Sequence, residues 1–138
     1  MARTVLIDSG CIIAALHRRD QHHAWARAHF DSFVDPCLTC EAVLSESFFL
    51  LQRARQATDA LCALLERKIV SVEYSFRAEL AATLGLLRRY ANVPMSFADA
   101  CLVRMAEVYD DVAVFTTDSD FEIYRRHGRQ VIPLITPY

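Results

Sequence analysis

Two uninterrupted apolar runs constrain the fold of this chain more than any other feature. The run TVLID at 4–8 ends in an acid, and the run VAVFTT at 112–117 is followed directly by Asp118. Runs without polar alternation are typical of strands covered on both faces, and such strands occur in parallel sheets packed between helices. Further short apolar runs alternate with helical patterns between these two. The alternation predicts an α/β sandwich around a mostly parallel sheet.

Hydrophobic periodicity sets the boundaries of the predicted elements. Strands are predicted at 4–8, 37–39, 69–74, 112–117 and 131–135, and helices at 9–16, 21–33, 40–53, 58–67, 76–91, 95–109 and 120–128. With only three glycines and four prolines, the chain has no linker rich in these residues. Its 138 residues suit one domain, predicted to span 1–138.

The apolar runs are all much shorter than the roughly 20 residues needed to cross a bilayer. The N-terminal run is also shorter than the apolar region of a signal peptide, which is at least about seven residues long. We therefore expect a cytoplasmic protein without a membrane segment.

The cysteines and the charges narrow the function classes. Cys37 and Cys40 form a C-x-x-C pair, but no second pair or H-x-x-x-H follows, so a zinc site lacks ligands and buried thiols are expected. A net charge of −2 leaves no overall basic footprint for nucleic acid. Fourteen of the 15 basic residues are nevertheless arginines, which match phosphates bidentately. Some of them are clustered, as at Arg18-Arg19 and at Arg53 and Arg55.

Four acids lie at positions where burying a carboxylate costs free energy or where ligand sites usually form. Asp8 and Asp118 follow strands, and ligand sites in parallel sheets lie at strand carboxyl ends. Glu46 and Asp99 lie on apolar faces of predicted helices, where an unpaired carboxylate costs several kcal/mol or takes up a proton. Such carboxylates repel one another unless a cation lies among them. Oxygen ligands without His or Cys select Mg²⁺ or Mn²⁺, and none of the five histidines is a close sequence neighbour of the four acids.

Each acid also fits a purely structural role. Ser96-x-x-Asp99 matches a capping box, and Asp118 can cap a helix. Asp8 can end its strand in a turn, and Glu46 can pair with a buried arginine. The four acids together are harder to explain as separate accidents.

The motifs VLIDSG, TCEAVLSESFFLL, MSFADACLVRMAE and VFTTDSDFEIYRRHG occur in this order along the chain. The ordered set resembles the PIN-domain family, most closely the VapC-like ribonuclease toxins. The resemblance implies a three-layer α/β/α sandwich with a central parallel sheet of four to five strands. It also implies an acidic quartet at Asp8, Glu46, Asp99 and Asp118.

Further site residues follow from the resemblance alone. Asp120 matches an auxiliary metal or water ligand, Thr116 or Thr117 a hydroxyl beside the site, and Ser9 the small polar residue after the first aspartate. Glu41 is a rival for the role of Glu46, which is preferred because it follows a VL pair and precedes an apolar run.

The resemblance implies Mg²⁺- or Mn²⁺-dependent hydrolysis of single-stranded RNA, with Asp8, Asp99 and Asp118 as direct ligands and Glu46 as a ligand or as the residue that orients water. It also implies a small antitoxin protein as partner, and a homodimer. Arginines at the rim would hold the RNA backbone.

Two alternatives remain open. One is a catalytically weak or inactive PIN-like module that binds RNA or protein, which the loss of one of the four acids would favour. The other is a Mg²⁺-dependent phosphate-handling α/β protein. Such proteins use a late lysine to hold the phosphoryl group, whereas Lys68, the only lysine here, precedes a middle strand.

Overall fold

A computed structural model describes residues 3–138 and contains a central five-stranded sheet. The strands lie in the order β3-β2-β1-β4-β7, and all four pairings are parallel. Their bounds are β1 Thr4–Ile7, β2 Cys37–Thr39, β3 Val70–Val72, β4 Val112–Phe115 and β7 Leu134–Ile135. The expected α/β architecture with a parallel sheet is confirmed.

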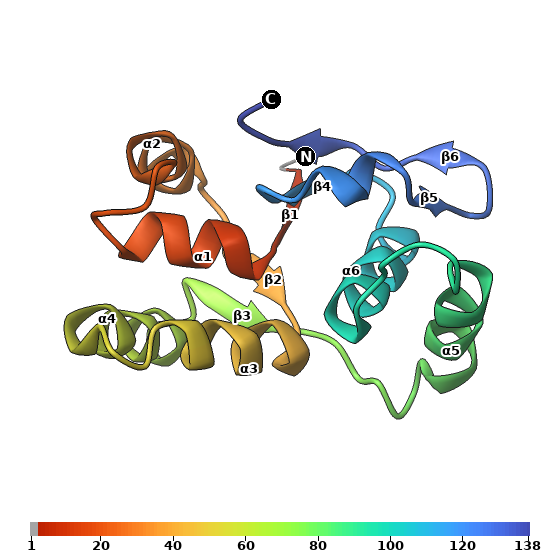
Figure 1. The fold of residues 1–138 in the computed structure, drawn as a ribbon, viewed down its shortest axis with the longest axis horizontal. Helices are drawn as coiled ribbons and strands as arrows, with labels where there is room; N and C mark the ends of the chain where they lie inside the picture. The colour runs from red at the N-terminus through yellow and green to blue at the C-terminus, as the bar shows by residue number, and fades with distance from the viewer. Residues whose placement is uncertain (1–2) are drawn as a thin grey trace.

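Helices cover both faces of this sheet (Figure 1). Helices α1, α2 and α4 lie on one side, and α5 and α6 lie on the other, which makes the three layers, while α3 contacts both α1 and α6. The helix bounds are α1 Ser9–Leu16, α2 His23–Ser32, α3 Glu41–Leu50, α4 Arg55–Glu66, α5 Leu80–Arg89 and α6 Phe97–Val108.

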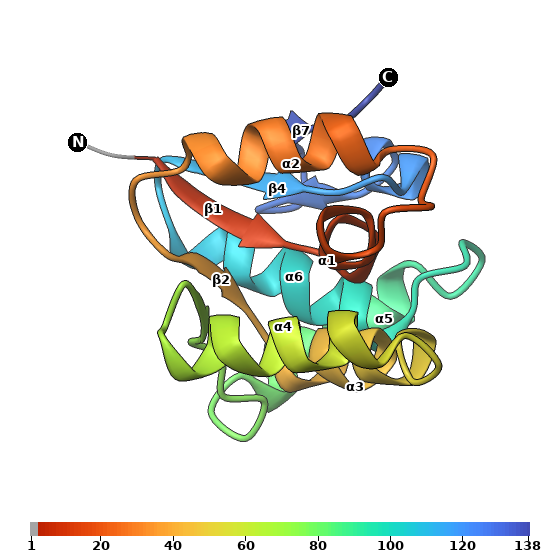
Figure 2. The same cartoon turned by 90° about the vertical axis from the view of Figure 1, so that its left-hand side faces the viewer.

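The centre of the sheet is formed by the two uninterrupted apolar runs. Thr4 to Ile7 of β1 pair with Val112 to Phe115 of β4 residue by residue, and every residue of β4 is buried. Figure 2 shows these strands side by side with α6 behind them. Because parallel strands share one direction, the segments that follow β1 and β4 emerge at the same edge of the sheet.

Helix α6 is largely buried, and its start is fixed by its own residues. Ser96 accepts a hydrogen bond from the backbone N–H of Asp99, and the Asp99 carboxylate accepts one from the backbone N–H of Ser96. This capping box satisfies two backbone donors that a helix leaves unpaired. It also fixes Asp99 at the carboxyl edge of the sheet.

The C-terminal region differs from the prediction. The helix expected at 120–128 is wrong: residues Ser119–Glu122 form a single 3-10 turn, and β5 (Arg125–Arg126) pairs with β6 (Gln130–Val131) in an antiparallel hairpin. His127 and Gly128 have positive φ angles of 53° and 80°, which form the turn. The strand expected at 131–135 is also divided, because Pro133 separates β6 from β7 and only β7 joins the main sheet.

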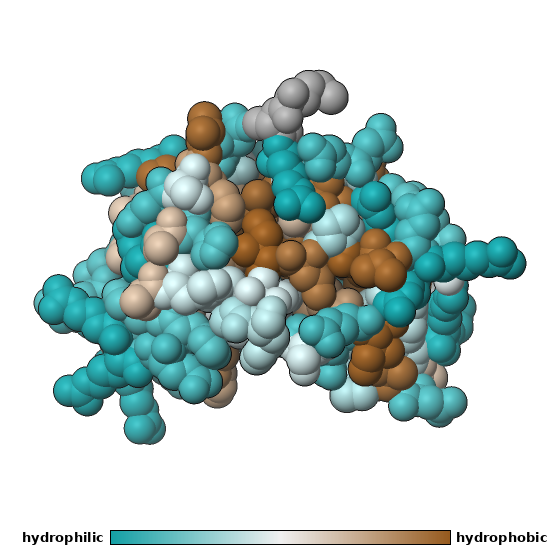
Figure 3. All heavy atoms as spheres, turned by 90° about the horizontal axis from the view of Figure 1, so that it is seen from above, coloured by the Kyte–Doolittle hydropathy of each residue, from teal (hydrophilic) through white to brown (hydrophobic). Residues whose placement is uncertain are grey.

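The surface over the C-terminal strands is partly apolar. Figure 3 shows hydrophobic residues on this face, surrounded by hydrophilic ones. Edge strand β7 is only two residues long, which limits pairing with other chains.

In residues 3–138, no helix has both the length and the apolar character that crossing a membrane requires. All five cysteines are free thiols; Cys37 and Cys40 are buried as expected, whereas Cys62 is exposed.

Candidate metal centre

Three aspartates from distant parts of the chain meet at the carboxyl edge of the sheet. Asp8 follows β1, Asp118 follows β4 by three residues, and Asp99 lies in the first turn of α6. One carboxylate oxygen from each lies within 4.8 Å of the other two. Asp8 and Asp99 are each only 6% exposed.

Within residues 3–138, no basic side chain forms an ion pair with the three aspartates. The ion pairs in this part of the chain join Arg3 to Asp111, Arg27 to Asp31, and Arg104 to Glu79 and Glu107. Converging carboxylates without a counter-charge are unfavourable in a low-dielectric site. A divalent cation would supply that counter-charge.

The hydroxyl of Thr116 connects two of the aspartates. It donates a hydrogen bond of 2.8 Å to Oδ2 of Asp8 and accepts one of 2.9 Å from the backbone N–H of Asp118. Thr116 is fully buried, so this arrangement is rigid. Of the two threonines expected near the site, Thr116 is therefore the one that contacts an aspartate.

Asp99 is held by a residue that the sequence pattern did not single out. The buried Tyr124 donates a hydrogen bond of 2.8 Å to Oδ2 of Asp99, the oxygen that also caps α6. The other oxygen, Oδ1, has no hydrogen bond within residues 3–138 and is open to a ligand. The only signal in the sequence was the spacing of Phe121 and Tyr124, three residues apart on one apolar face.

The structural and functional roles of the three acids are compatible. Asp8 caps α1 by accepting from Ser9 N–H, and Asp118 caps the 3-10 turn by accepting from Asp120 N–H. Asp99 closes the capping box of α6. Each capping bond fixes one carboxylate in the geometry that brings the three together.

Burial and mutual repulsion change the acidity of two of these groups. Loss of hydration raises the pKa of Asp8 from 3.8 to about 6; the charges of Asp99 and Asp118 act in the same direction, and the bonds from Thr116 and Ser9 oppose the rise. Burial also raises the pKa of Asp99, against the hydrogen bond from Tyr124. Such shifts are typical of functional sites.

Glu46 occupies a different position from the one expected. It is exposed, with the neighbouring Phe49 and Leu50 67% and 57% exposed, so the expectation of a buried glutamate is wrong. Helix α3 turns this face toward solvent because Val43 and Ser47 occupy its buried face. Glu46 still lies at the site, because Ser9 Oγ donates a hydrogen bond of 2.7 Å to its Oε1.

Asp120 and Glu41 lie outside the three-aspartate cluster. The structure ties Asp120 to the site through its backbone N–H, which donates to Asp118 Oδ1 at 2.9 Å. Glu41 is exposed in the first turn of α3 and lines another cavity. The geometry therefore favours Glu46 over Glu41 as the glutamate of the site.

The acids line an open cleft of about 340 Å³. Its lining is Asp8, Ser9, Gly10, Glu46, Leu50, Pro94, Ser96, Asp99, Thr117 and Asp118. None of these lining residues is basic, so the cleft itself suits cations and not anions. The three-aspartate cluster offers only carboxylate oxygens, which match the preference of Mg²⁺ and Mn²⁺. The donor set thus fits the expected metal.

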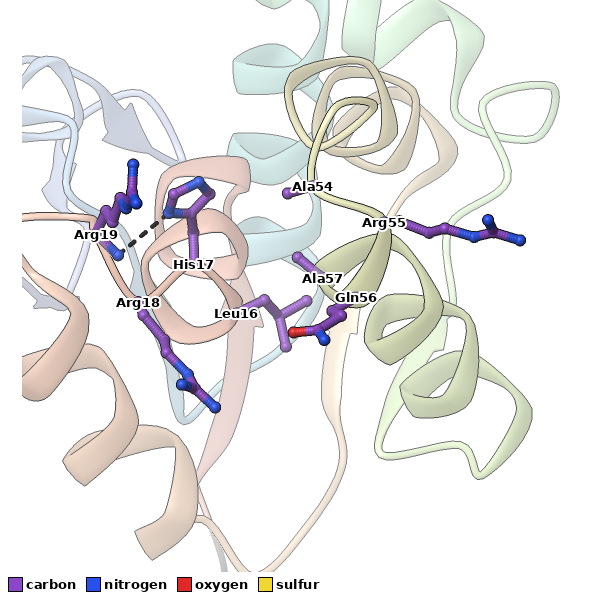
Figure 4. Close-up of a pocket in the computed structure, with 8 residues that line it drawn as sticks. All are labelled: Leu16, His17, Arg18, Arg19, Ala54, Arg55, Gln56 and Ala57. Carbon is purple, nitrogen blue, oxygen red and sulfur yellow. Dashed lines mark hydrogen bonds between the residues drawn. The ribbon is translucent and has the colours of Figure 1, made fainter.

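Three of the clustered arginines lie away from the acidic cleft. Arg18, Arg19 and Arg55 line a cavity of about 370 Å³ between the end of α1 and the start of α4. Figure 4 shows their side chains extending in three different directions, and the backbone N–H of Arg19 donates to the ring of His17. The guanidinium groups do not converge, so this cavity is not a preformed phosphate site.

Comparisons with known proteins agree with this architecture. The family model described as the PIN domain matches residues 5–126. The crystal structure of Mycobacterium tuberculosis VapC20, described as a sarcin-ricin loop cleaving toxin, superimposes with a TM-score of 0.77 at 22% sequence identity. The alignment covers 87% of this chain and 94% of that one. No curated protein matches the chain in sequence.

Proposed function

Because this chain belongs to the PIN domain family, we propose that it is a divalent-metal-dependent endoribonuclease that cleaves single-stranded RNA. The observation that carries the proposal is the group of Asp8, Asp99 and Asp118, which has no basic partner within residues 3–138. A divalent cation held there, Mg²⁺ or Mn²⁺, would supply the positive charge that polarises a phosphodiester and lowers the pKa of water.

The chain's own residues have separable roles in this proposal. Asp8, Asp99 and Asp118 would hold the cation, and Thr116 and Tyr124 orient two of these aspartates through their hydroxyl hydrogen bonds. Glu46 is anchored by Ser9 but is open to solvent, so its carboxylate can accept a proton from an attacking water. Asp120 is proposed as an outer ligand, through a water.

The phosphate-handling alternative has less support. In such proteins a lysine holds the phosphoryl group beside the acids. Lys68 immediately precedes Ile69 and β3 and is therefore at the amino edge of the parallel sheet, whereas the three aspartates lie at the carboxyl edge. Retention of all four acids likewise weighs against an inactive module.

The decisive experiment is cleavage of a labelled single-stranded RNA with Mg²⁺, Mn²⁺ or EDTA. We expect cleavage with either metal, none in EDTA, and a loss of more than about 100-fold in Asp8→Asn, since even outer-shell partners of a metal site contribute about 10- to 100-fold. Asp59→Asn, an exposed acid on α4, is the matched control and should cleave normally. Cleavage that survives both EDTA and Asp8→Asn would refute the mechanism.

We propose further that the enzyme acts in the cytoplasm as the toxin of a toxin–antitoxin pair and forms a homodimer. Support for the toxin role comes from the fold shared with VapC20. Leu50 lines the acidic cleft and Phe49 beside it is exposed, so an antitoxin that covers both would also close the cleft. Growth arrest on expression of the wild type but not of Asp8→Asn tests the toxin role, and sedimentation velocity tests the dimer.

A further inference from the structure

We propose that a second cavity, beside the acidic cleft, binds an unpaired nucleobase of the RNA strand, an inference that rests on the proposed nuclease function. This base cavity has a volume of about 300 Å³ and is lined in part by Tyr74, Phe76 and Phe97. Its size falls at the lower end of the range for small-ligand pockets, about 300 to 1,000 Å³.

The base cavity opens at the same edge of the sheet as the metal centre. Its lining residues come from the start of α3, which follows β2, and from residues 74–77, which follow β3. The start of α6 joins the two sites, because Ser96 lines the acidic cleft and Phe97, the next residue, lines the base cavity. A strand with one phosphodiester in the cleft therefore has a neighbouring nucleotide within reach of the base cavity.

The aromatic lining suits a base. Phe97 is 41% exposed although it is a large apolar side chain, and its ring packs edge-to-face against Phe76 with centroids 4.9 Å apart and an interplanar angle of 86°. This contact fixes the orientation of the Phe97 ring while part of it stays open to solvent. Single-stranded RNA is commonly recognised by stacking of splayed bases on such aromatic side chains.

The charged residues at the rim favour a base over a phosphate. Arg77 and Glu41 both line the base cavity and both are exposed, and neither takes part in an ion pair found in residues 3–138. A carboxylate beside the guanidinium disfavours an anion. A nucleobase is neutral and carries donors and acceptors on its edge, so it can accept from Arg77 and donate to Glu41.

The test uses a labelled single-stranded RNA of mixed sequence bound to Asp8→Asn protein, with affinity followed by fluorescence anisotropy. In this background Phe97→Ala should weaken binding about 5- to 150-fold, the range expected for loss of one base–aromatic stack. Phe97→Trp should preserve binding and Phe97→Leu should not, which separates stacking from apolar packing. Val108→Ala, an exposed apolar position at the other end of α6, is the control and should bind normally.

A scan with RNAs that each lack one base gives the sharper result. At one position, removal of the base should weaken binding to the Phe97-containing protein and cause no further loss in Phe97→Ala. If the loss of affinity from base removal and the loss from Phe97→Ala add up at every position of the RNA, the proposal is overturned. The proposal is also overturned if Phe97→Ala leaves the RNA affinity unchanged but alters sedimentation. That result would show that the cavity contacts a second copy of the chain.

Two controls keep this result separate from the function itself. Arg77→Gln tests the base cavity even if the Phe97 variant folds poorly. Because Arg77 is exposed, this substitution should weaken RNA binding and leave the melting temperature unchanged. Metal-dependent cleavage by the wild type tests the nuclease independently. If cleavage is normal and both substitutions leave RNA affinity unchanged, only the base cavity is refuted.

Discussion

At the scale of single residues, the centre is built from acids whose positions are fixed by hydrogen bonds that also begin helical turns. Asp8, Asp99 and Asp118 each accept a backbone N–H bond at the start of a helix or turn. The side-chain hydroxyls of Thr116 and Tyr124 then set the orientation of two of them. Such contacts raise metal affinity by fixing the ligand before the metal arrives.

Tyr124→Phe tests this orienting role directly. The substitution removes the hydrogen bond to Asp99 Oδ2 and keeps the ring packed against those of Tyr90 and Phe121. We therefore expect Mn²⁺ affinity to fall about 10- to 100-fold. Isothermal titration calorimetry with Mn²⁺ measures this without RNA.

Tyr90→Phe is the matched control. The Tyr90 ring packs against that of Tyr124 with centroids 5.3 Å apart, but its hydroxyl accepts from the backbone N–H of Arg125. The substitution should change stability by about 1 kcal/mol, the usual contribution of one hydrogen bond, and leave Mn²⁺ affinity unchanged. Equal losses of affinity in both variants would contradict a specific role for Tyr124.

Glu46→Gln separates catalysis from stability. Because Glu46 is exposed and outside the aspartate cluster, the substitution should change the free energy of unfolding by less than about 0.5 kcal/mol, as is usual for surface positions. RNA cleavage should fall at least about 100-fold if the carboxylate serves as base. Denaturant unfolding and the RNA cleavage assay measure the two quantities.

Glu66→Gln is the control for this variant. Glu66 is an exposed glutamate, the last residue of α4, and it lines neither the acidic cleft nor the base cavity. Cleavage by Glu66→Gln should therefore stay close to that of the wild type. A larger loss of cleavage in Glu41→Gln than in Glu46→Gln would exchange the roles of the two glutamates.

At the scale of elements, the close approach of α1 to the segment after β4 holds the site together. A Cβ atom on Gly10, in the first turn of α1, would overlap with Oγ1 of Thr117, while the Thr117 Cβ would remain at 3.5 Å, an ordinary contact. Gly10 therefore allows the helix that follows Asp8 to lie directly against the segment that carries Asp118.

Gly10→Ala should disturb this contact. We expect a loss of about 1 to 3 kcal/mol in the free energy of unfolding, the usual cost of overpacking, and reduced cleavage because Asp118 is displaced. Denaturant unfolding and RNA cleavage measure the two effects. The double variant Gly10→Ala/Thr117→Ala removes the overlapping oxygen, so it should recover most of the lost stability and most of the lost cleavage. If the losses from the two substitutions add up instead, the contact is not their cause.

The elements that the sequence predicted well are those with a strong local pattern. The buried runs of β1 and β4 and the helix at 9–16 were found because apolar periodicity and chain direction are local properties. The hairpin after Glu122 was missed because FEIY has helical spacing, while the chain is turned by the positive φ angles at His127 and Gly128. Tertiary contacts of Tyr124 with Asp99 and Tyr90, which no local pattern shows, favour the turn.

The site was predictable only in part for the same reason. The family resemblance pointed to the acids, and strand direction explains why Asp8 and Asp118 share an edge. The exposure of Glu46 depends on how α3 is rotated, and its helix neighbours are apolar on both sides, so periodicity did not reveal it. The contact of Tyr124 with Asp99 spans 25 residues and two elements.

At the scale of the whole molecule, the metal centre should lower the stability of the metal-free protein. The pKa of Asp8 in the folded state, about 6, lies above its ordinary value of 3.8. Asp8 therefore lowers the free energy of unfolding only above about pH 4. This lowering grows as the pH rises to about 6 and reaches about 3 kcal/mol at pH 7. In EDTA we expect unfolding to become easier across this interval.

Asp8→Asn should remove much of this pH dependence. In EDTA at pH 7 the variant should be more stable than the wild type by up to about 3 kcal/mol, and near pH 4 the difference should vanish. Mg²⁺ should raise the melting temperature of the wild type and not of the variant, because only the wild type gains from binding. Equal stability of the two proteins in EDTA at pH 7 would contradict the proposed repulsion.

The order of the strands also has a consequence for the chain as it is made. β1 is synthesised first, but its partner β4 and the residues Thr116 and Asp118 come much later, as the 108-residue separation of Asp8 and Thr116 shows. The three aspartates therefore cannot meet until β4 has been synthesised and has paired with β1. A growing polypeptide that has not yet reached β4 lacks the proposed nuclease site.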